Sequence, residues 1–507
     1  MMTVTIKDRK LFFRNVTPGV EAMLEKWFSA RDPQYQFQVG IIQGTSYDGW
    51  VRKYNKIKQT LPITFLGELK RNCQKFNVQF QIEDRREPPK FQADLNVVSA
   101  DMFPGIRLED YQVRAIRAAC SEECGLIQAS PGAGKTEVIA GIIKAYACPT
   151  VVLAEQTVVV DQLKARLELR QVVEEVGQFY AGKTPNDKMV CVGTSASLFI
   201  PPQPERRGGL EPEEFIRQLQ SWTTRKRNAE LYRSFVYAAD LAIVDEADLG
   251  ITMTHRHMLR HWFKGRRRFG TSGTPFDPSK PVQGLIVREL YGSIISSVDR
   301  QEVEECGRII PVTYHMIVFG EDGDKWEGST WDIALREKVI ENQCFHQLVT
   351  KIVAAFPNDG TLVLVEINDL GQALQEAIPG SVFVHGLTSK GNRRKLFKKF
   401  EEREITCLIG GKIIKRGFDL KNGCENLILC GMGQMQSDLL QQIGRAMRLN
   451  SKGKARVFDF YCMNNKYLYD HSKERLKTMV AAGYKTFVHH KGETMSGKDL
   501  VKRKFRL

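Results

Sequence analysis

Residues 129–136 read Ala-Ser-Pro-Gly-Ala-Gly-Lys-Thr, and they stand between an apolar run, residues 125–129, and an amphipathic segment, residues 137–146. A strand, a glycine-rich turn and a helix in this order place backbone N–H groups around an anion, and the helix dipole favours negative charge at the same point. The stretch therefore predicts a phosphate-binding loop at the edge of a parallel sheet that is covered by helices.

The side chains of this loop suit a nucleotide phosphate and a magnesium ion. Gly132 and Gly134 permit a tight backbone path, Lys135 can balance phosphate charge, and Thr136 can offer its hydroxyl to Mg²⁺. Ala129 stands where the simplest phosphate-loop pattern has its first glycine. We assign the nucleotide contacts of the loop to Ser130, Gly132, Ala133, Gly134, Lys135 and Thr136.

A second apolar run, residues 241–244, ends in the acidic residues Asp245, Glu246 and Asp248. A buried strand that ends in a carboxylate brings this group to the carboxyl edge of the sheet, where ligands of α/β proteins bind. We expect Asp245 to hold Mg²⁺ through water and Glu246 to polarise an attacking water molecule. With Lys135, these acids predict hydrolysis of a nucleotide.

The strand and helix pattern divides the 507-residue chain, which is too long for one hydrophobic core. Residues 1–95 read as a small α+β domain, and residues 103–305 and 310–507 each alternate strands with helices. A charged, helical stretch, residues 201–239, reads as an insertion in the first series. The expected fold class is α/β, with two tandem parallel-sheet domains after the small domain. The strands that we expect lie at residues 125–129, 150–154, 189–193, 241–245, 361–365, 382–384, 406–409 and 426–429.

The second α/β series carries a pair of arginines. Residues 441–448 read Gln-Gln-Ile-Gly-Arg-Ala-Met-Arg, so Arg445 and Arg448 stand three apart and share one face of a helix. Across a cleft between two domains, such guanidinium groups could reach a γ-phosphate and stabilise the charge that spreads in the transition state. The other residues assigned to this half of the site are Gln441 and, in a preceding loop suited to sense nucleotide and nucleic acid, Gly417 and Asp419.

The composition of the chain favours a polyanionic partner. The formal net charge is +15, and 42% hydrophobic with 26% charged residues is ordinary for a globular protein. The first residues are charged where a signal peptide would be apolar, and no apolar run reaches the roughly 18 residues of a membrane span. Eleven cysteines without a CxxC pair predict free thiols. We expect a cytoplasmic protein, in the host cytoplasm if phage-encoded, without a membrane partner.

These segments, taken in order, resemble the motif series of superfamily 2 helicases between residues 105 and 450. Residues 129–136 resemble motif I, residues 245–248 motif II, residues 271–275 motif III, residues 416–419 motif V and residues 441–448 motif VI. The resemblance implies an ATP- and Mg²⁺-dependent helicase whose core consists of two tandem RecA-like domains. It also implies adenine contacts for Tyr111 and Gln112, and nucleic-acid contacts for Thr157, Gln162 and Thr194.

More narrowly, the chain resembles the UvsW-type phage helicases, which process branched DNA. Residues 47–54 and 61–66 resemble the small N-terminal DNA-binding domain of that group. In the first stretch, cationic and aromatic side chains alternate in a way that suits phosphate contacts and stacking, and solvated charge around a small core would look the same. The residues assigned there are Trp50, Arg52, Lys53 and Tyr54. The resemblance implies remodelling of forks and Holliday junctions in recombination, repair and replication restart.

Three alternatives stay open at this point. The first is a duplex translocase that displaces proteins without net unwinding. The second is an RNA helicase, because motif II spells Asp-Glu-Ala-Asp, although the motif VI ending differs from the pattern of that group. The third is a nucleic-acid-binding scaffold with a decayed nucleotide site, which the intact Lys135 and Asp245 oppose. A metal site at His255, His257 and His261 lacks an acid or cysteine nearby to complete it.

Overall fold

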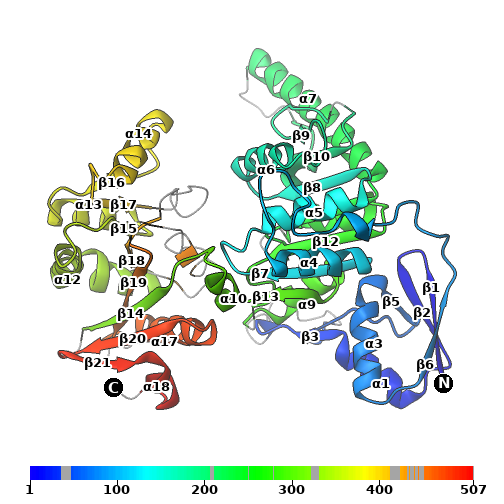
Figure 1. Cartoon of the computed structure of the whole chain (residues 1–507), viewed down its shortest axis with the longest axis horizontal. Coiled ribbons are helices and arrows are strands. Elements are labelled where there is room, and N and C mark those ends of the chain that lie inside the picture. Colours follow the sequence, from blue (N-terminus) through cyan, green and yellow to red (C-terminus); the bar gives the residue numbers. More distant parts are fainter. Residues whose placement is uncertain are drawn as a thin grey trace. The chain divides into compact units, whose positions relative to one another are not determined.

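The computed structural model describes residues 1–35, 47–185, 187–205, 211–248, 251–277, 279–320, 330–411, 423–430, 433, 439, 443–444, 450 and 452–505. The chain forms two compact units. The first comprises residues 1–130 and 134–298, and the second comprises residues 131–133 and 299–507. Each unit contains one large, mostly parallel sheet with helices on it, so the expected α/β class with two parallel-sheet domains is confirmed (Figure 1).

The first unit is built on a seven-stranded sheet in the order β13-β7-β12-β11-β8-β10-β9, and all of its neighbouring strands are parallel. Its central strands are buried along nearly their whole length, as expected for a sheet covered on both faces. The strands are β7 (Cys124–Ala129), β8 (Thr150–Ala154), β9 (Gly177–Phe179), β10 (Val190–Thr194), β11 (Leu241–Asp245), β12 (Arg267–Ser272) and β13 (Ile294–Val298).

Helices lie in most of the connections between these strands, because parallel neighbours need crossover connections. The helix α5 (Lys135–Tyr146) is buried along most of its length, because its apolar residues face both the sheet and α4 (Asp110–Ser121). The expected insertion contains one long helix, α7 (Pro212–Ala238), whose last third buries Tyr232 and Val236 in the core. The other helices are α6 (Thr157–Leu169), α8 (Met253–His257), the π-helical turn η4 (Met258–Trp262) and α9 (Pro281–Tyr291).

The N-terminal segment forms a small α+β layer with its own four-stranded sheet, in the order β5-β2-β1-β6. The helical spacing of the apolar residues in 20–28 and 66–73 and the alternation at residues 78–82 predict two helices and a strand in this segment, and the structure has two helices and a strand there. A further alternation, at residues 35–39, lies mostly outside the described residues. Its elements are β1 (Met2–Lys7), β2 (Lys10–Arg14), α1 (Pro18–Trp27), β3 (Ser29–Arg31), β4 (Trp50–Arg52), β5 (Thr60–Pro62), α3 (Leu66–Lys75) and β6 (Phe80–Asp84).

This layer is docked on α9 of the first unit rather than being tethered beside it. Leu285 of α9 is fully buried within the N-terminal hydrophobic core. Glu289 of the same helix pairs with Lys53 at 2.5 Å, and Arg288 pairs with Glu68 at 2.6 Å. Arg9 donates to the carbonyl oxygens of η4 and of the loop after it, Leu259 O at 3.0 Å among them. Shared apolar packing and ion pairs therefore join the two parts into one body.

The second unit is built on an eight-stranded sheet in the order β16-β17-β15-β18-β19-β14-β20-β21, parallel except for its last pair. Its strands are β14 (Val312–Phe319), β15 (Thr361–Leu364), β16 (Val382–Val384), β17 (Cys407–Gly410), β18 (Asn426–Leu429), β19 (Ala455–Cys462), β20 (Lys485–His490) and β21 (Glu493–Ser496). Its helices are α10 (Arg300–Glu305), α11 (Trp331–Leu335), α12 (Gln343–Ala354), α13 (Asn368–Ala377), α14 (Lys390–Glu401), α17 (Lys466–Ala481) and α18 (Gly497–Lys502).

Two further expectations concern the chain as a whole. Among the residues that the structure describes, none of the helices is long and apolar enough to cross a bilayer. All eleven cysteines are free thiols, most of them buried, as the absence of CxxC pairs predicts.

Candidate active site

The predicted phosphate loop lies between β7 and α5, where a strand, a turn and a helix were expected. Gly132 and Gly134 have φ angles of 86° and 73°, in the left-handed region that favours glycine, and Gly134 is the residue that precedes the first turn of α5. At the start of the loop, the Ser130 amide and hydroxyl both lie 3.4 Å from the carbonyl oxygen of Val298. The backbone thus brings Lys135 and Thr136 to the positively polarised end of a buried helix.

Gln112 packs against this loop. It belongs to the first turn of α4, where its Oε1 accepts a hydrogen bond from the Glu109 amide at 3.0 Å and completes a capping box. A β-carbon at Gly134 would lie 2.4 Å from Gln112 Nε2, and the φ angle of 73° also favours glycine at this position. Tyr111, by contrast, is 1% exposed and packs in the core. The structure thus brings Gln112, more directly than Tyr111, to the nucleotide loop.

Lys135 and Glu246 form an ion pair, with 2.6 Å between Nζ and Oε1. Burial by itself lowers the pKa of Lys135, but the carboxylates of Glu246 and Asp245 outweigh it, and the pKa lies above its ordinary value. Lys135 is therefore cationic at neutral pH, and it stands next to the acidic end of β11. The two halves of the predicted hydrolytic site, the lysine and the paired acids, meet in the first unit.

Two hydroxyl groups of β12 hold the acids in place. The Thr271 hydroxyl donates to Asp245 Oδ1 at 2.7 Å, and the Ser272 hydroxyl donates to Asp248 Oδ1. Their positions follow from the parallel register, in which Asp245 lies opposite Thr271. Reasoning residue by residue misses the contacts that Thr271 and Ser272 make with these acids, because the sequence gives no register. The resemblance of residues 271–275 to motif III was the signal that marked them.

The turn after β11 depends on a close approach of the backbone. Glu246 has a φ angle of 50°, an unusual left-handed conformation for a residue with a side chain, and its amide donates to Asp245 Oδ1 at 3.1 Å. A β-carbon at Gly270 would lie 2.7 Å from the β-carbon of Ala247. Glycine in β12 therefore lets the acidic turn fold back onto the sheet, which aims Glu246 at Lys135.

The donor set fits a nucleotide with its magnesium ion. The glycine loop and the start of α5 form a cradle of backbone amides in which Lys135 supplies positive charge. The Thr136 hydroxyl and the Asp245 carboxylate are oxygen ligands of the kind that Mg²⁺ prefers. Among the described residues there is no cluster of three or more His, Cys, Asp or Glu side chains that could bind a metal by themselves. His255 instead contacts the Tyr291 hydroxyl at 2.5 Å in the core.

The residues assigned to nucleic acid in the first parallel-sheet domain differ in exposure. Thr157 opens α6, and both it and Gln162 are exposed on that helix. Thr194 ends β10 and is 5% exposed, with its hydroxyl 2.8 Å from that of Ser197. Thr157 and Gln162 are therefore available to a ligand, whereas the buried Thr194 side chain is hydrogen-bonded to Ser197.

The assignments in the N-terminal layer need a correction. Tyr54 is 3% exposed and packs edge-on against Phe13, with ring centroids 5.5 Å apart, so it cannot stack on bases without leaving the core. Lys53 is committed to its ion pair with Glu289. Trp50, at 42% exposure, and Arg52 remain on the surface. Alternation in sequence does not distinguish a binding ring from a core ring, because only the packed structure decides which face is buried.

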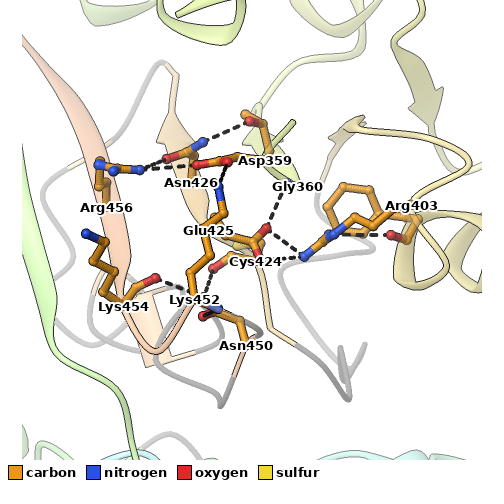
Figure 2. Close-up of polar contacts among 12 residues, drawn as sticks. Asp359, Gly360, Arg403, Cys424, Glu425, Asn426, Asn450, Lys452, Lys454 and Arg456 are labelled. Carbon is orange, nitrogen blue, oxygen red and sulfur yellow. Dashed lines mark hydrogen bonds and ion pairs between the residues drawn. The ribbon is translucent and has the colours of Figure 1, made fainter. Parts of the chain in front are cut away.

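The predicted residues Gly417, Asp419, Gln441, Arg445 and Arg448 lie outside the described residues. Residues 423–430 and residue 450, which follow these predicted residues in the chain, are described, and they take part in one polar cluster (Figure 2). Asn450 donates to the carbonyl oxygens of Cys424 at 3.1 Å and Lys454 at 3.0 Å. The chain just after residues 412–422 is thus hydrogen-bonded to the chain just after residues 445–449.

The same cluster pairs buried acids with basic residues at the amino edge of the second sheet. Glu425, 1% exposed, accepts from Arg403 Nη2 at 2.6 and 2.7 Å and from the Gly360 amide at 2.7 Å. Asp359, 4% exposed, pairs with Lys452 and with Arg456, the latter at 3.3 Å. Figure 2 shows these contacts converging from the starts of β15, β18 and β19. Buried charges arranged in this way are satisfied, so the edge is fixed in position.

Comparison with known proteins finds a family match in each of the two units. Residues 105–277 match the family described as the type III restriction enzyme, res subunit, and residues 347–450 match the helicase conserved C-terminal domain. A protein of Haloarcula marismortui named as a putative DNA 3'-5' helicase Rad25 is 23% identical over 367 residues, which are 71% of this chain and 54% of that protein. The chain thus spans about half the length of that relative.

Two solved structures are similar to this one. A fragment of a putative HsdR subunit of a type I restriction enzyme from Vibrio vulnificus matches with a TM-score of 0.52 and 16% identity, over 84% of this chain and 75% of that chain. UvsW of bacteriophage T4 matches with a TM-score of 0.42 and 15% identity, over 96% of this chain and 98% of that chain. The first of these likenesses supports the fold described above.

Proposed function

Because the chain belongs to helicase superfamily 2, we propose that it is an ATP-hydrolysing motor that moves on DNA and remodels branched duplexes such as forks and Holliday junctions. The observation that carries the proposal is the meeting of Lys135 with Glu246 at the end of β11, beside an Asp245 carboxylate that Thr271 holds in place. This arrangement has the charges and the oxygen ligands that hydrolysis of a phosphoanhydride requires.

Each residue of this group has a distinct task in the proposed reaction. Lys135 neutralises phosphate charge, and the amides at the start of α5 orient the phosphates. When Lys135 turns from Glu246 to a phosphate, the Glu246 carboxylate becomes able to orient a water molecule and to accept its proton. Asp245 and Thr136 hold the metal. Bound Mg²⁺–ATP supplies the bond whose cleavage drives the cycle.

The choice of DNA and of branched substrates rests on several kinds of support. The relatives are named DNA helicases or translocases, and the net charge of +15 suits a polyanion. Residues 47–54 and 61–66 of the N-terminal layer resemble the small DNA-binding domain of the UvsW-type helicases, and Trp50 and Arg52 lie on the surface of this layer. We infer a role in recombination, repair and replication restart, in the cytoplasm of the cell that makes the protein.

An RNA helicase is the second candidate, because motif II spells Asp-Glu-Ala-Asp. Asp248 of this motif is buried and bonded to Ser272 of motif III, so the spelling has a structural consequence here. The structure of the acidic turn does not depend on the nucleic acid, and the substrate is therefore a matter for direct measurement.

The decisive experiment compares ATP turnover with single-stranded DNA, linear duplex, forked DNA, four-way junctions and RNA. We expect forks and junctions to stimulate turnover most. Stronger stimulation by RNA would replace the proposal with the RNA helicase, and turnover that ignores every nucleic acid would remove the motor. A strand-displacement assay on the same forks separates a helicase from a translocase that does not unwind.

The variant Lys135→Ala is the matched control for that comparison. It removes the cation that faces Glu246, so we expect loss of ATP hydrolysis with every substrate and unchanged binding of DNA. Retained turnover in Lys135→Ala would show that the phosphate loop is misassigned. The control for the removal of a lysine is Lys351→Ala, at an exposed position on α12, and this variant should hydrolyse ATP at the normal rate.

A further inference from the structure

The helix α14 carries a continuous basic surface at one end of the second unit, next to the edge strand β16 (Figure 1). Its sequence, Lys-Gly-Asn-Arg-Arg-Lys-Leu-Phe-Lys-Lys-Phe-Glu, contains no acidic residue before Glu401. Phe397 and Phe400 are 5% and 0% exposed and fix the inner face of the helix. The outer face is therefore determined by packing, and it consists of exposed cations: Arg394, Lys395, Lys398 and Lys399.

These cations are available to a ligand. Lys398 pairs with Glu402 at 3.5 Å, and Lys399 pairs with Glu404 at 3.3 Å. The side chains of both pairs are 48–73% exposed. Such surface ion pairs contribute only about 0–1 kcal/mol to stability. For Arg394 and Lys395, the described part of the chain offers no ion-pair partner within 4 Å. Residues four apart on a helix lie about 6 Å apart along its axis, so the surface presents two rows of positive charge.

An exposed apolar side chain lies in the turn that leads into this basic helix. Leu387, in the turn between β16 and α14, is 92% exposed. The turn is fixed from three sides: the Thr388 amide donates to His385 O at 3.0 Å, the His385 amide donates to the Thr388 hydroxyl at 3.2 Å, and Arg393 Nε donates to Thr388 O at 2.7 Å. Contact of an exposed leucine side chain with water is unfavourable, and a partner that covered this side chain would gain free energy on binding.

We propose that Leu387 and the outer face of α14 form a nucleic-acid contact at the point where a duplex separates into single strands. This inference rests on the proposed function and adds the surface and the feature of DNA that it recognises. The cations lie against phosphates, which carry no sequence information but give affinity. Leu387 lies against the bases that the opened duplex exposes, as apolar wedges do at unstacked base steps. A protein partner is less favoured, because the four cations of this face outnumber Glu402 and Glu404, the acids that pair with two of them, and an excess of positive charge matches a polyanion.

The first test measures the salt dependence of DNA binding for the double variant Arg394→Gln/Lys395→Gln. Each lost phosphate contact lowers the slope of log K against log salt by about 0.9, so we expect a decrease of about 1.8 on forked DNA. The control is Lys351→Gln/Lys466→Gln, which removes the same charge from exposed positions on α12 and α17. Equal slopes for the two double variants would overturn the contact with phosphates, because a general effect of net charge would act on both alike.

The second test compares the affinity for a fork with the affinity for a linear duplex in Leu387→Ser. We expect the preference for the fork to fall about tenfold, as the loss of one covered leucine implies, with an unchanged salt slope. Leu169→Ser, at a residue of 62% exposure on α6, is the control and should keep the preference. An unchanged preference in Leu387→Ser would exclude contact of this turn with bases.

Different results would contradict the proposed function and the proposed contact of α14 and Leu387 with nucleic acid. If the unmodified protein neither binds DNA nor hydrolyses ATP faster in its presence, the proposed function is wrong. If the unmodified protein does both, and the α14 and Leu387 variants behave like their controls, the proposed function stands and this inference alone is wrong.

Discussion

The Thr271 hydroxyl holds the Asp245 carboxylate of the candidate active site in one orientation. Asp245 ends a buried strand, where a carboxylate without a partner would be costly. The hydroxyl on the neighbouring strand satisfies one of its oxygens at 2.7 Å and leaves the other oxygen for a metal ligand sphere. Thr271 therefore orients Asp245, as groups behind metal ligands commonly do.

The substitution Thr271→Val removes this hydrogen bond at nearly constant volume. A hydrogen bond to a charged group contributes about 1.5–3 kcal/mol, so we expect ATP turnover to fall about 10- to 100-fold and the Mg²⁺ concentration for half-maximal activity to rise. Thr223→Val, at a threonine whose hydroxyl bonds the backbone of α7, is the control. Normal turnover and normal Mg²⁺ dependence in Thr271→Val would show that Asp245 does not need this support.

His255 makes the first unit sensitive to acid. Burial lowers the pKa of His255 from 6.5 to about 4. Because the folded state favours the neutral ring, the stabilisation is complete above pH 6.5 and is lost as the pH falls towards 4, where the unfolded chain takes up the proton first. The loss attributable to this residue is about 3 kcal/mol.

The variant His255→Gln keeps a hydrogen-bonding group near Tyr291 but does not titrate. Its free energy of unfolding in urea should fall less than that of the unmodified protein between pH 7 and pH 4.5, by about 2.4 kcal/mol. Parallel pH profiles for the two proteins would mean that His255 is not the group responsible.

At the scale of whole elements, sequence pattern succeeds where a strand is apolar throughout. β8, β11 and β18 begin and end at the residues that their apolar runs predict. β12 escapes such a prediction, because it starts with two arginines, Arg267 and Arg268, that resemble a surface run. The structure buries Arg268 to 6% exposure and pairs Arg267 with Glu123 at 3.6 Å, so these cations serve the fold rather than a ligand.

The docking of the N-terminal layer is another feature of elements that pattern cannot give. Helical spacing and alternation predict α1, α3 and β6, but they do not say what these elements pack against. Leu285 of α9 belongs to the core of the N-terminal layer. Removal of residues 1–95 would therefore expose a core leucine and the Glu289 carboxylate, and would test stability together with substrate preference.

A point substitution separates these effects. Leu285→Ala leaves a cavity between α9 and the N-terminal layer, and we expect the free energy of unfolding to decrease by about 2–5 kcal/mol. Leu231→Ala, at a leucine of 44% exposure on α7, should change it by less than about 0.5 kcal/mol. Similar stabilities for the two variants would mean that the N-terminal layer does not depend on this contact.

At the scale of the whole molecule, the proposed motor needs residues from both units. Lys135 and the acids belong to the first unit, and we expect Arg445 and Arg448, which belong to the second, to complete the catalytic site. The polar cluster around Asn450 and Glu425 fixes the chain that leaves both motif segments of the second unit. A stiff support of this kind suits groups that have to meet a transition state in one geometry.

The variant Arg448→Ala tests the contribution of the second unit. We expect ATP hydrolysis to slow by at least about tenfold while ATP still binds, because the guanidinium acts on charge that develops in the transition state. Arg336→Ala, at an arginine of 66% exposure in the same unit, is the control. Equal rates for the two variants would remove Arg448 from the catalytic site.

By itself, the sequence determined the fold class, the two parallel sheets, and the lysine and acids that meet at the end of β11. It could do so because buried parallel strands are apolar runs and a phosphate loop needs particular residues at fixed local spacing. The tertiary structure alone decided that Thr271 supports Asp245, that Tyr54 belongs to a core and that the N-terminal layer is joined to α9. These facts depend on strand register and on packing between distant segments, and no local spacing encodes either of them.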